Sequence, residues 1–108
     1  MKKLIIIPAY NEAESIEATV RGIQSKMHGF DYVVINDCST DETPDICRKN
    51  NFNMVSLPVN LGIGGAVQTG YIYARDNGYE IAVQMDGDGQ HDVCLLYTSP
   101  SPRDTERS

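Results

Sequence analysis

The feature that most constrains the fold of this chain is a regular alternation of short apolar runs with segments of helical periodicity. Four runs are predicted as strands, at residues 3–7, 32–36, 53–57 and 80–85. Two of them contain the continuous apolar stretches LIII and YVVI. Continuous apolar stretches are typical of strands that are buried on both faces. The runs therefore favour the interior strands of a sheet that is covered on both sides.

Three segments between these runs are predicted as helices, at residues 12–27, 43–50 and 64–77. Asn11 is the expected N-cap of the first helix, with Glu14 placed as the carboxylate of a capping box. Thr43 is the expected cap of the second helix, with Pro44 at its first position. Gly78 is placed as the C-terminal cap of the third.

The resulting order, β-α-β-α-β-α-β, predicts an α/β fold. Right-handed crossovers produce a Rossmann-like, mostly parallel sheet with helices on both faces. In related doubly wound sheets the strand order is 3-2-1-4. We therefore expect the fourth strand to be an edge without a further neighbour, which makes the chain prone to aggregation.

Charge and cysteine content narrow the function classes. The 108 residues carry nine Lys+Arg against fifteen Asp+Glu, a net charge of −6, so we expect no nucleic-acid partner. The apolar run at residues 4–7 is too short for a transmembrane segment. The three cysteines form no CxxC pair, which argues against a disulfide framework or a zinc site and favours the cytoplasm.

The loops that follow the four strands carry the candidate chemistry, because ligands of parallel sheets bind at the carboxyl ends of strands. These loops read PAYNE at 8–12, NDCSTD at 36–41, NLGIGG at 60–65 and DGDGQHD at 86–92. Carboxylates that converge on one edge repel one another unless a cation joins them. The pattern predicts a divalent-cation and phosphate site.

Asp86 and Asp88 are the predicted metal-binding residues, for Mg²⁺ or Mn²⁺, which take oxygen ligands from carboxylates and phosphates. Asp88 is favoured for direct metal contact and Asp86 for a sugar or ribose hydroxyl. The alternative is a surface turn, since Asp-Gly is common in hairpins.

The remaining loop residues also have structural alternatives. The glycine loop at 60–65 presents backbone N–H groups to a phosphate or ribose, or its glycines serve tight packing. Glu12 favours the positive end of a helix dipole whether or not it binds a ligand. Asp37 is equally suited to capping a turn.

Together the four motifs resemble family 2 glycosyltransferases, in the branch that acts on dolichyl or polyprenyl phosphates. The resemblance spans residues 3–92 and implies a GT-A fold, a nucleotide-sugar donor, a divalent metal and inversion at the anomeric carbon. Two positions depart from the common DDGSTD form of the second motif. Asn36 stands in place of an aspartate and Cys38 in place of a glycine.

The resemblance also implies roles for individual residues. Asp86 and Asp88 would form the DxD motif for the metal and the diphosphate, and Asp37 would hydrogen-bond the base. The residues implied to line the donor nucleotide site are Pro8, Ala9, Tyr10, Glu12, Asp37, Asn60, Gly62, Gly65 and Asp86.

We interpret residues 1–92 as the donor-binding half of such an enzyme and expect it to be inactive alone. The catalytic base is unknown, and the acceptor would be a polyprenyl phosphate or a glycan. The full-length relative would associate with the cytoplasmic face of a membrane. Residues 93–108, rich in Ser, Pro and Arg, are predicted to be a disordered, non-family tail.

Two other functions share part of this pattern. A haloacid-dehalogenase-like phosphatase also places Asp-x-Asp after an apolar strand, but after its first strand and with a threonine where Gln90 stands. A non-catalytic nucleotide-binding module would keep the donor site without turnover.

Overall fold

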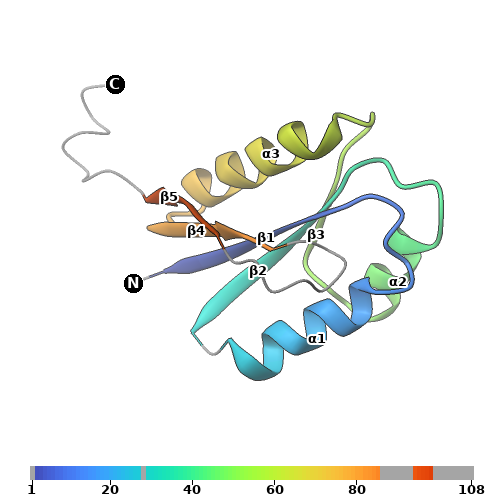
Figure 1. Cartoon of the computed structure of the whole chain (residues 1–108), viewed down its shortest axis with the longest axis horizontal. Helices are drawn as coiled ribbons and strands as arrows, with labels where there is room; N and C mark the ends of the chain where they lie inside the picture. Colours follow the sequence, from blue (N-terminus) through green and yellow to red (C-terminus); the bar gives the residue numbers. More distant parts are fainter. Residues whose placement is uncertain (1, 28, 86–93, 99–108) are drawn as a thin grey trace.

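The computed structural model describes residues 2–27 and 29–85, and the backbone of residues 94–98. The elements follow the predicted alternation (Figure 1). The strands are β1 (Lys3–Ala9), β2 (Phe30–Asn36), β3 (Met54–Ser56), β4 (Ile81–Gln84) and β5 (Cys94–Thr98). The helices are α1 (Ile16–Lys26), α2 (Thr43–Lys49) and α3 (Gly62–Asp76).

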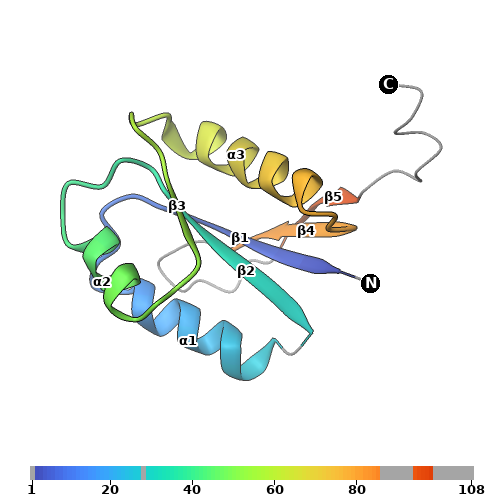
Figure 2. The same ribbon diagram turned by 180° about the vertical axis from the view of Figure 1, so that it is seen from behind.

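The sheet has the order β3-β2-β1-β4-β5, which confirms the predicted order of the first four strands. Strands β1 to β4 are parallel, with Ile5 of β1 opposite Tyr32 of β2 and Val83 of β4. Helices α1 and α2 lie on one face and α3 on the other (Figures 1 and 2). The α/β, Rossmann-like class is therefore confirmed.

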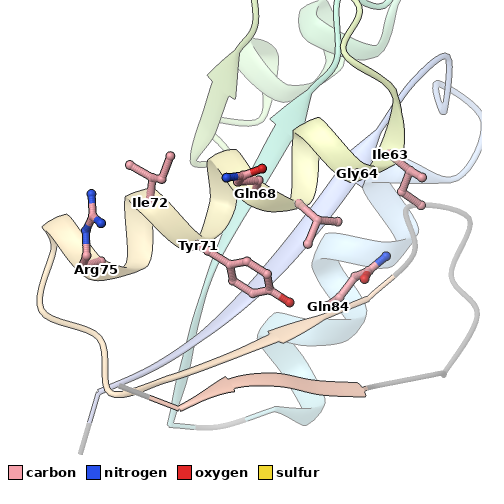
Figure 3. Close-up of a pocket in the computed structure, with 8 residues that line it drawn as sticks. Ile63, Gly64, Gln68, Tyr71, Ile72, Arg75 and Gln84 are labelled. Carbon is pink, nitrogen blue, oxygen red and sulfur yellow. The ribbon is translucent and has the colours of Figure 1, made fainter. Parts of the chain in front are cut away.

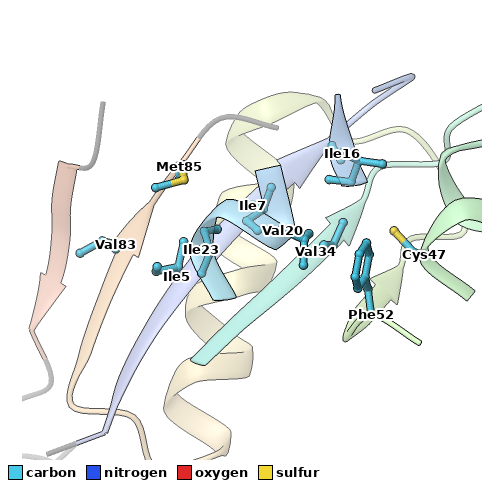
Figure 4. Close-up of a cluster of buried hydrophobic side chains, with 11 residues drawn as sticks. Ile5, Ile7, Ile16, Val20, Ile23, Val34, Cys47, Phe52, Val83 and Met85 are labelled. Atoms are coloured by element: carbon cyan, nitrogen blue, oxygen red, sulfur yellow. The ribbon is translucent and has the colours of Figure 1, made fainter. Parts of the chain in front are cut away.

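The central strand β1 explains why helices cover both faces of the sheet. Its alternate side chains point to opposite faces and pack into two separate hydrophobic cores. Ile5 and Ile7 pack with Val20 and Ile23 of α1 (Figure 4). Leu4 and Ile6 pack under α3 on the opposite face. All four β1 side chains are fully buried, as the apolar run predicted. Gly70 lets α3 approach closely, since a Cβ there would lie 2.4 Å from Cγ2 of Ile6.

The predicted start of the first helix was wrong. Helix α1 begins at Ile16, after a turn whose Ser15 and Ile16 N–H groups donate to the Glu12 carbonyl. Asn11 is not its N-cap: it has a positive φ of 54° and bonds another loop. The other two helices lie close to their predicted bounds.

Strand β5 corrects the expectation of an unpaired edge. Cys94–Thr98 runs antiparallel to β4, with Gln84 opposite Cys94 and an irregularity between Ala82 and Val83. The prediction that residues 93–108 are disordered is therefore wrong for Cys94–Thr98, and the rest of that segment lies outside the described residues. Without a neighbour, the outer side of β4 would expose unpaired backbone N–H and C=O groups. Pairing with β5 gives these groups hydrogen-bond partners.

Candidate functional site

The candidate site lies at the carboxyl ends of the parallel strands, where the β1–α1, β2–α2 and β3–α3 loops meet. The register of the strands brings these loops together. Ala9 of β1 is opposite Asn36 of β2, and Asn36 is opposite Ser56 of β3. Backbone pairing continues one residue past the strand, since the Asp37 N–H donates to the Ala9 carbonyl at 2.9 Å. The sequence prediction that these loops share one edge is therefore confirmed for the first three.

Asp37 is the buried acid of this edge, with 3% of its surface exposed. Its Oδ1 accepts the Leu61 N–H at 2.7 Å, and its carbonyl accepts from Asn60 Nδ2 at 3.0 Å. Asp37 thus fixes the start of the glycine loop. A carboxylate has about four acceptor positions, so this bond leaves capacity for a further donor.

The two unusual residues of the NDCSTD motif have clear structural roles. Asn36 Oδ1 accepts the Ser39 N–H at 3.1 Å, while its Nδ2 donates to Ser56 Oγ at 3.2 Å. Cys38 has a φ of 58°, in the left-handed region that favours glycine. The glycine of the DDGSTD pattern would adopt this φ with little strain, and this chain adopts it with a cysteine.

The β1–α1 and β2–α2 loops are joined by side-chain bonds in both directions. The N–H groups of Asn11, Glu12 and Ala13 donate to Ser39 Oγ, Thr43 Oγ1 and Asp41 Oδ2, at 3.1, 2.9 and 3.2 Å. In return, the Thr40 and Asp41 N–H groups donate to Asn11 Oδ1, at 2.8 and 3.3 Å.

Asp41 is the charged member of this network. Burial alone would raise the pKa of its carboxyl, but hydrogen bonds from the Thr43 hydroxyl, the Thr43 N–H and the Ala13 N–H lower that pKa below the usual value. The carboxylate is therefore the form that the folded loops hold.

Of the β1–α1 residues predicted to line the site, Tyr10 is the most exposed, with 47% of its surface accessible. Ala9 is buried and Pro8 is half-buried. Glu12 Oε2 accepts from Ser15 Oγ at 3.1 Å, so its carboxylate is held at the turn that precedes α1. Both interpretations of Glu12, as ligand-binding or as a helix-start residue, fit this position.

The glycine loop opens α3. Gly62 is the first residue of the helix and has a φ of 79°, and a Cβ at Gly65 would lie 2.5 Å from Cβ of Leu61. These two glycines therefore serve the loop's conformation and its packing. The first N–H groups of α3 lie at the same edge as Asp37, where a helix N-terminus favours an anion.

The predicted metal-binding residues Asp86 and Asp88 lie outside the described residues. Within the described part of the chain, no three His, Cys, Asp or Glu side chains gather as a metal site. Asp86 and Asp88, which follow β4 in the sequence, are carboxylates, the type of side chain that Mg²⁺ or Mn²⁺ would take as a ligand.

A cavity of about 620 Å³ runs along α3 and was not foreseen from the sequence. Ile63 and Gln84 lie at its end nearest the candidate site, and Arg75 lies at the other, with Tyr71 pointing from α3 toward β4 (Figure 3). Among the described residues, those predicted to line the donor nucleotide site do not line this cavity, although Ile63 and Gly64 of the glycine loop do.

The comparison with protein families decides the class of this chain. The glycosyl transferase family 2 profile matches residues 4–97. The chain belongs to this family. The match extends through residues 94–97 of β5, beyond the resemblance at residues 3–92.

Two relatives of this family 2 chain are named as transferases for undecaprenyl phosphate and dolichyl phosphate. It is 32% identical to the undecaprenyl-phosphate mannosyltransferase of Micrococcus luteus, over 84% of the chain and 40% of the relative. It is 36% identical to the UDP-N-acetylglucosamine–dolichyl-phosphate N-acetylglucosaminyltransferase of Methanococcus voltae, over 81% of the chain and 41% of the relative. The chain thus spans about two fifths of the length of these relatives.

The fold of the family 2 chain is similar to a solved mannosyltransferase of Pyrobaculum calidifontis, in complex with GDP-Man and Mn²⁺. The TM-score is 0.70 at 28% identity, over 81% of the chain and 27% of that protein. In the part of the chain that the structure describes, no helix is long and apolar enough to cross a membrane.

Proposed function

We propose that this chain forms the donor-binding part of a metal-dependent, inverting glycosyltransferase. The enzyme transfers a sugar from a nucleotide-sugar to a polyprenyl phosphate or a glycan. The observation that carries the proposal is buried Asp37, which joins the end of β2 to the start of α3 at the loop edge. The relatives that use lipid-linked phosphates and the GDP-Man complex of a similar fold support it.

In this proposal the described residues bind and orient the nucleotide. Asp37 accepts an N–H of the base, and the exposed ring of Tyr10 stacks on that base. Pro8, Ala9 and Glu12 complete the wall on the β1 side. Asn60, Gly62 and Gly65 shape the loop that meets the ribose, with the first N–H groups of α3 toward the phosphates.

The metal would be held by Asp86 and Asp88. A bound Mg²⁺ or Mn²⁺ supplies Lewis-acid stabilisation of the diphosphate that leaves the sugar. The described loop segments at this edge, residues 8–15, 37–42 and 57–61, contain no lysine or arginine that would neutralise the phosphates instead. A polyprenyl-phosphate acceptor is already anionic and needs little activation, so no base is assigned.

Calorimetric titration of the 108-residue chain with UDP and with GDP, each with Mn²⁺ or with EDTA, tests the proposal. We expect binding of one nucleotide with Mn²⁺ and much weaker binding with EDTA. Asp88→Asn should weaken binding with Mn²⁺. The control Asp45→Asn makes the same chemical change on the exposed face of α2 and should leave binding unchanged.

Equal affinity with Mn²⁺ and with EDTA would remove the metal from the proposal. A turnover assay with a polyprenyl phosphate separates the alternatives: binding without transfer by the complete protein would make it a nucleotide-binding module. We further propose that the complete enzyme works at the cytoplasmic face of a membrane, where fractionation of cells that express it gives the test.

A further inference from the structure

We infer that Asn11 is a positioning residue that makes the two donor-site loops one rigid unit. The inference rests on the proposed function, because it concerns the affinity for the nucleotide. Asn11 itself is absent from the predicted binding residues. We use the name interloop clasp for a set of hydrogen bonds between the two loops. In it, loop N–H groups donate to the side chains of Asn11, Ser39, Asp41 and Thr43.

The bonds of the interloop clasp run in both directions. Three successive N–H groups of the β1–α1 loop, from Asn11 to Ala13, each donate to a different side chain of the β2–α2 region. In the other direction, Asn11 Oδ1 accepts hydrogen bonds from the Thr40 N–H and hydroxyl and from the Asp41 N–H. Neither loop can therefore shift by itself without breaking bonds that belong to the other.

Asparagine suits position 11 for two reasons, its backbone conformation and its side-chain acceptor. With a φ of 54°, its backbone is left-handed, which asparagine tolerates better than most residues. Its amide oxygen accepts two backbone N–H groups at once. Glycine would keep the backbone and lose the acceptor, whereas aspartate would keep both.

A backbone bond and the interloop clasp lie on opposite sides of Tyr10, at the proposed base site. On one side of Tyr10 the Asp37 N–H bonds the Ala9 carbonyl, and on the other the Asn11 N–H bonds Ser39 Oγ. Tyr10 is thus anchored through its neighbours on both sides while its surface stays 47% exposed. Together, the backbone bond and the clasp hold Tyr10 in place relative to Asp37, and these are the two groups proposed to hold the base.

The first experiment compares nucleotide affinity among three variants of the 108-residue chain. Asn11→Gly should weaken binding of the preferred nucleotide, UDP or GDP, about tenfold, the size expected from one or two lost hydrogen bonds. Asn11→Asp should restore most of that affinity. Asn53→Ala is the matched control, since it removes side-chain bonds to Tyr32 and Tyr73 at the opposite edge of the sheet.

The outcomes distinguish this inference from the proposed function. If the wild type binds and Asn11→Gly binds equally well, or Asn53→Ala weakens binding as much, Asn11 has no positioning role. If the wild type binds neither nucleotide with Mn²⁺, the proposed function is wrong, and the second experiment alone decides whether the loops are coupled.

The second experiment is amide hydrogen exchange in Asn11→Gly without nucleotide. The Glu12 and Ala13 amides bond Thr43 and Asp41 rather than the Asn11 side chain. Faster exchange at Glu12 and Ala13, as well as at Thr40 and Asp41, would show that the interloop clasp is one unit. Faster exchange confined to Thr40 and Asp41 would overturn the inference.

Discussion

The parallel sheet has loops at two opposite edges, one at the carboxyl ends of the strands and one at their amino ends. The loops at both edges contain residues with a left-handed backbone, but different kinds of hydrogen bonds hold them in place. Among the described residues, positive φ occurs at Gly29, Asn51 and Gly78 in the helix-to-strand turns, and at Asn11, Cys38 and Gly62 in the strand-to-helix loops. Each connection from β1 to β4 therefore has one described left-handed residue, within the connection or, for Gly62, at the first position of the helix that follows.

The helix-to-strand turns are closed by the local backbone. After α3, the Gly78 N–H donates to the Arg75 carbonyl and the Tyr79 N–H to the Ala74 carbonyl, which is a Schellman motif. After α2, the Phe52 N–H donates to the Cys47 carbonyl at 2.8 Å. These bonds need no particular side chain beyond a residue that tolerates a left-handed backbone.

The strand-to-helix loops are closed by side chains of other loops. Asp37, Asn11 and Asp41 each accept N–H groups from a loop other than their own. The identity of the side chain therefore matters at this edge and matters little at the other. Loops of this kind carry function in α/β proteins, while the turns mainly determine stability.

The largest expected effect comes from Asp37→Ala. It leaves the Leu61 N–H without its acceptor, so we expect a loss of about 2 kcal/mol in the free energy of unfolding. Nucleotide affinity should fall about 10- to 100-fold, as for a lost bond to a charged group. Asp31→Ala removes an acceptor of the Tyr79 hydroxyl at the other edge, and should leave affinity unchanged in the same titration.

Asp41→Asn should cost about 1.5 kcal/mol at pH 7, because an amide has one acceptor oxygen where the carboxylate supplies two. The pKa of Asp41 is lowered in the folded chain, so its contribution is present above the usual value of 3.8 and is lost as the pH falls through the lowered value. Urea unfolding from pH 2 to 7 should therefore show the two curves converging at low pH. A constant difference would contradict the role of the charge.

Gly62→Ala and Gly78→Ala form a matched pair, since both residues have a φ near 80° and open space at the Cβ position. Each should lower the free energy of unfolding by about 1 kcal/mol. Only Gly62→Ala should also weaken nucleotide binding. Equal effects on binding would show that the two edges do not differ in function.

Tyr79→Phe should change how the free energy of unfolding depends on pH in the alkaline range. Burial, together with the hydrogen bond to Asp31, raises the pKa of Tyr79 far above its usual value of 10. Its contribution is therefore complete below pH 10 and is lost as the pH rises above it. Thermal melts should show a loss of about 1 kcal/mol in the variant at pH 8 and a flatter decline above pH 10.

The smallest expected effect is a gain. Cys38→Gly relieves a left-handed backbone, worth about 1–2 kcal/mol, but increases the freedom of the unfolded chain by up to about 1 kcal/mol. We expect a net stabilisation of about 0.5 kcal/mol in guanidinium unfolding. A loss of stability would mean that the Cys38 side chain contributes more than its backbone costs.

The sequence predicted those features that depend on local pattern. The apolar runs located β1 to β4, and the position of Gly78 located the end of α3. The parallel sheet followed from the crossover rules, and the strand order from the common order of doubly wound sheets. The meeting of three loops followed because the carboxyl ends of parallel strands share one edge.

The features that escaped prediction depend on contacts between distant segments. Asn11 reads as an N-cap because asparagine often caps the helix next to it, yet its amide bonds Thr40 and Asp41, 29 and 30 residues away. The pairing of β5 with β4 was missed because the Ser- and Pro-rich composition of the tail concealed the short run at Cys94–Thr98. The roles proposed for Asp86 and Asp88 stay predictions.

The central place of β1 has a consequence for synthesis on the ribosome. Lys3 of β1 pairs with Phe30 and with Ile81, so one edge of the strand finds its partner early and the other only after β4 has emerged. Until then, the β2–β1 pair exposes a strand rich in isoleucine with unpaired backbone groups, a template for pairing with a neighbouring nascent chain. Chaperone demand during translation should therefore peak before residue 81 leaves the exit tunnel and fall once β4 has docked.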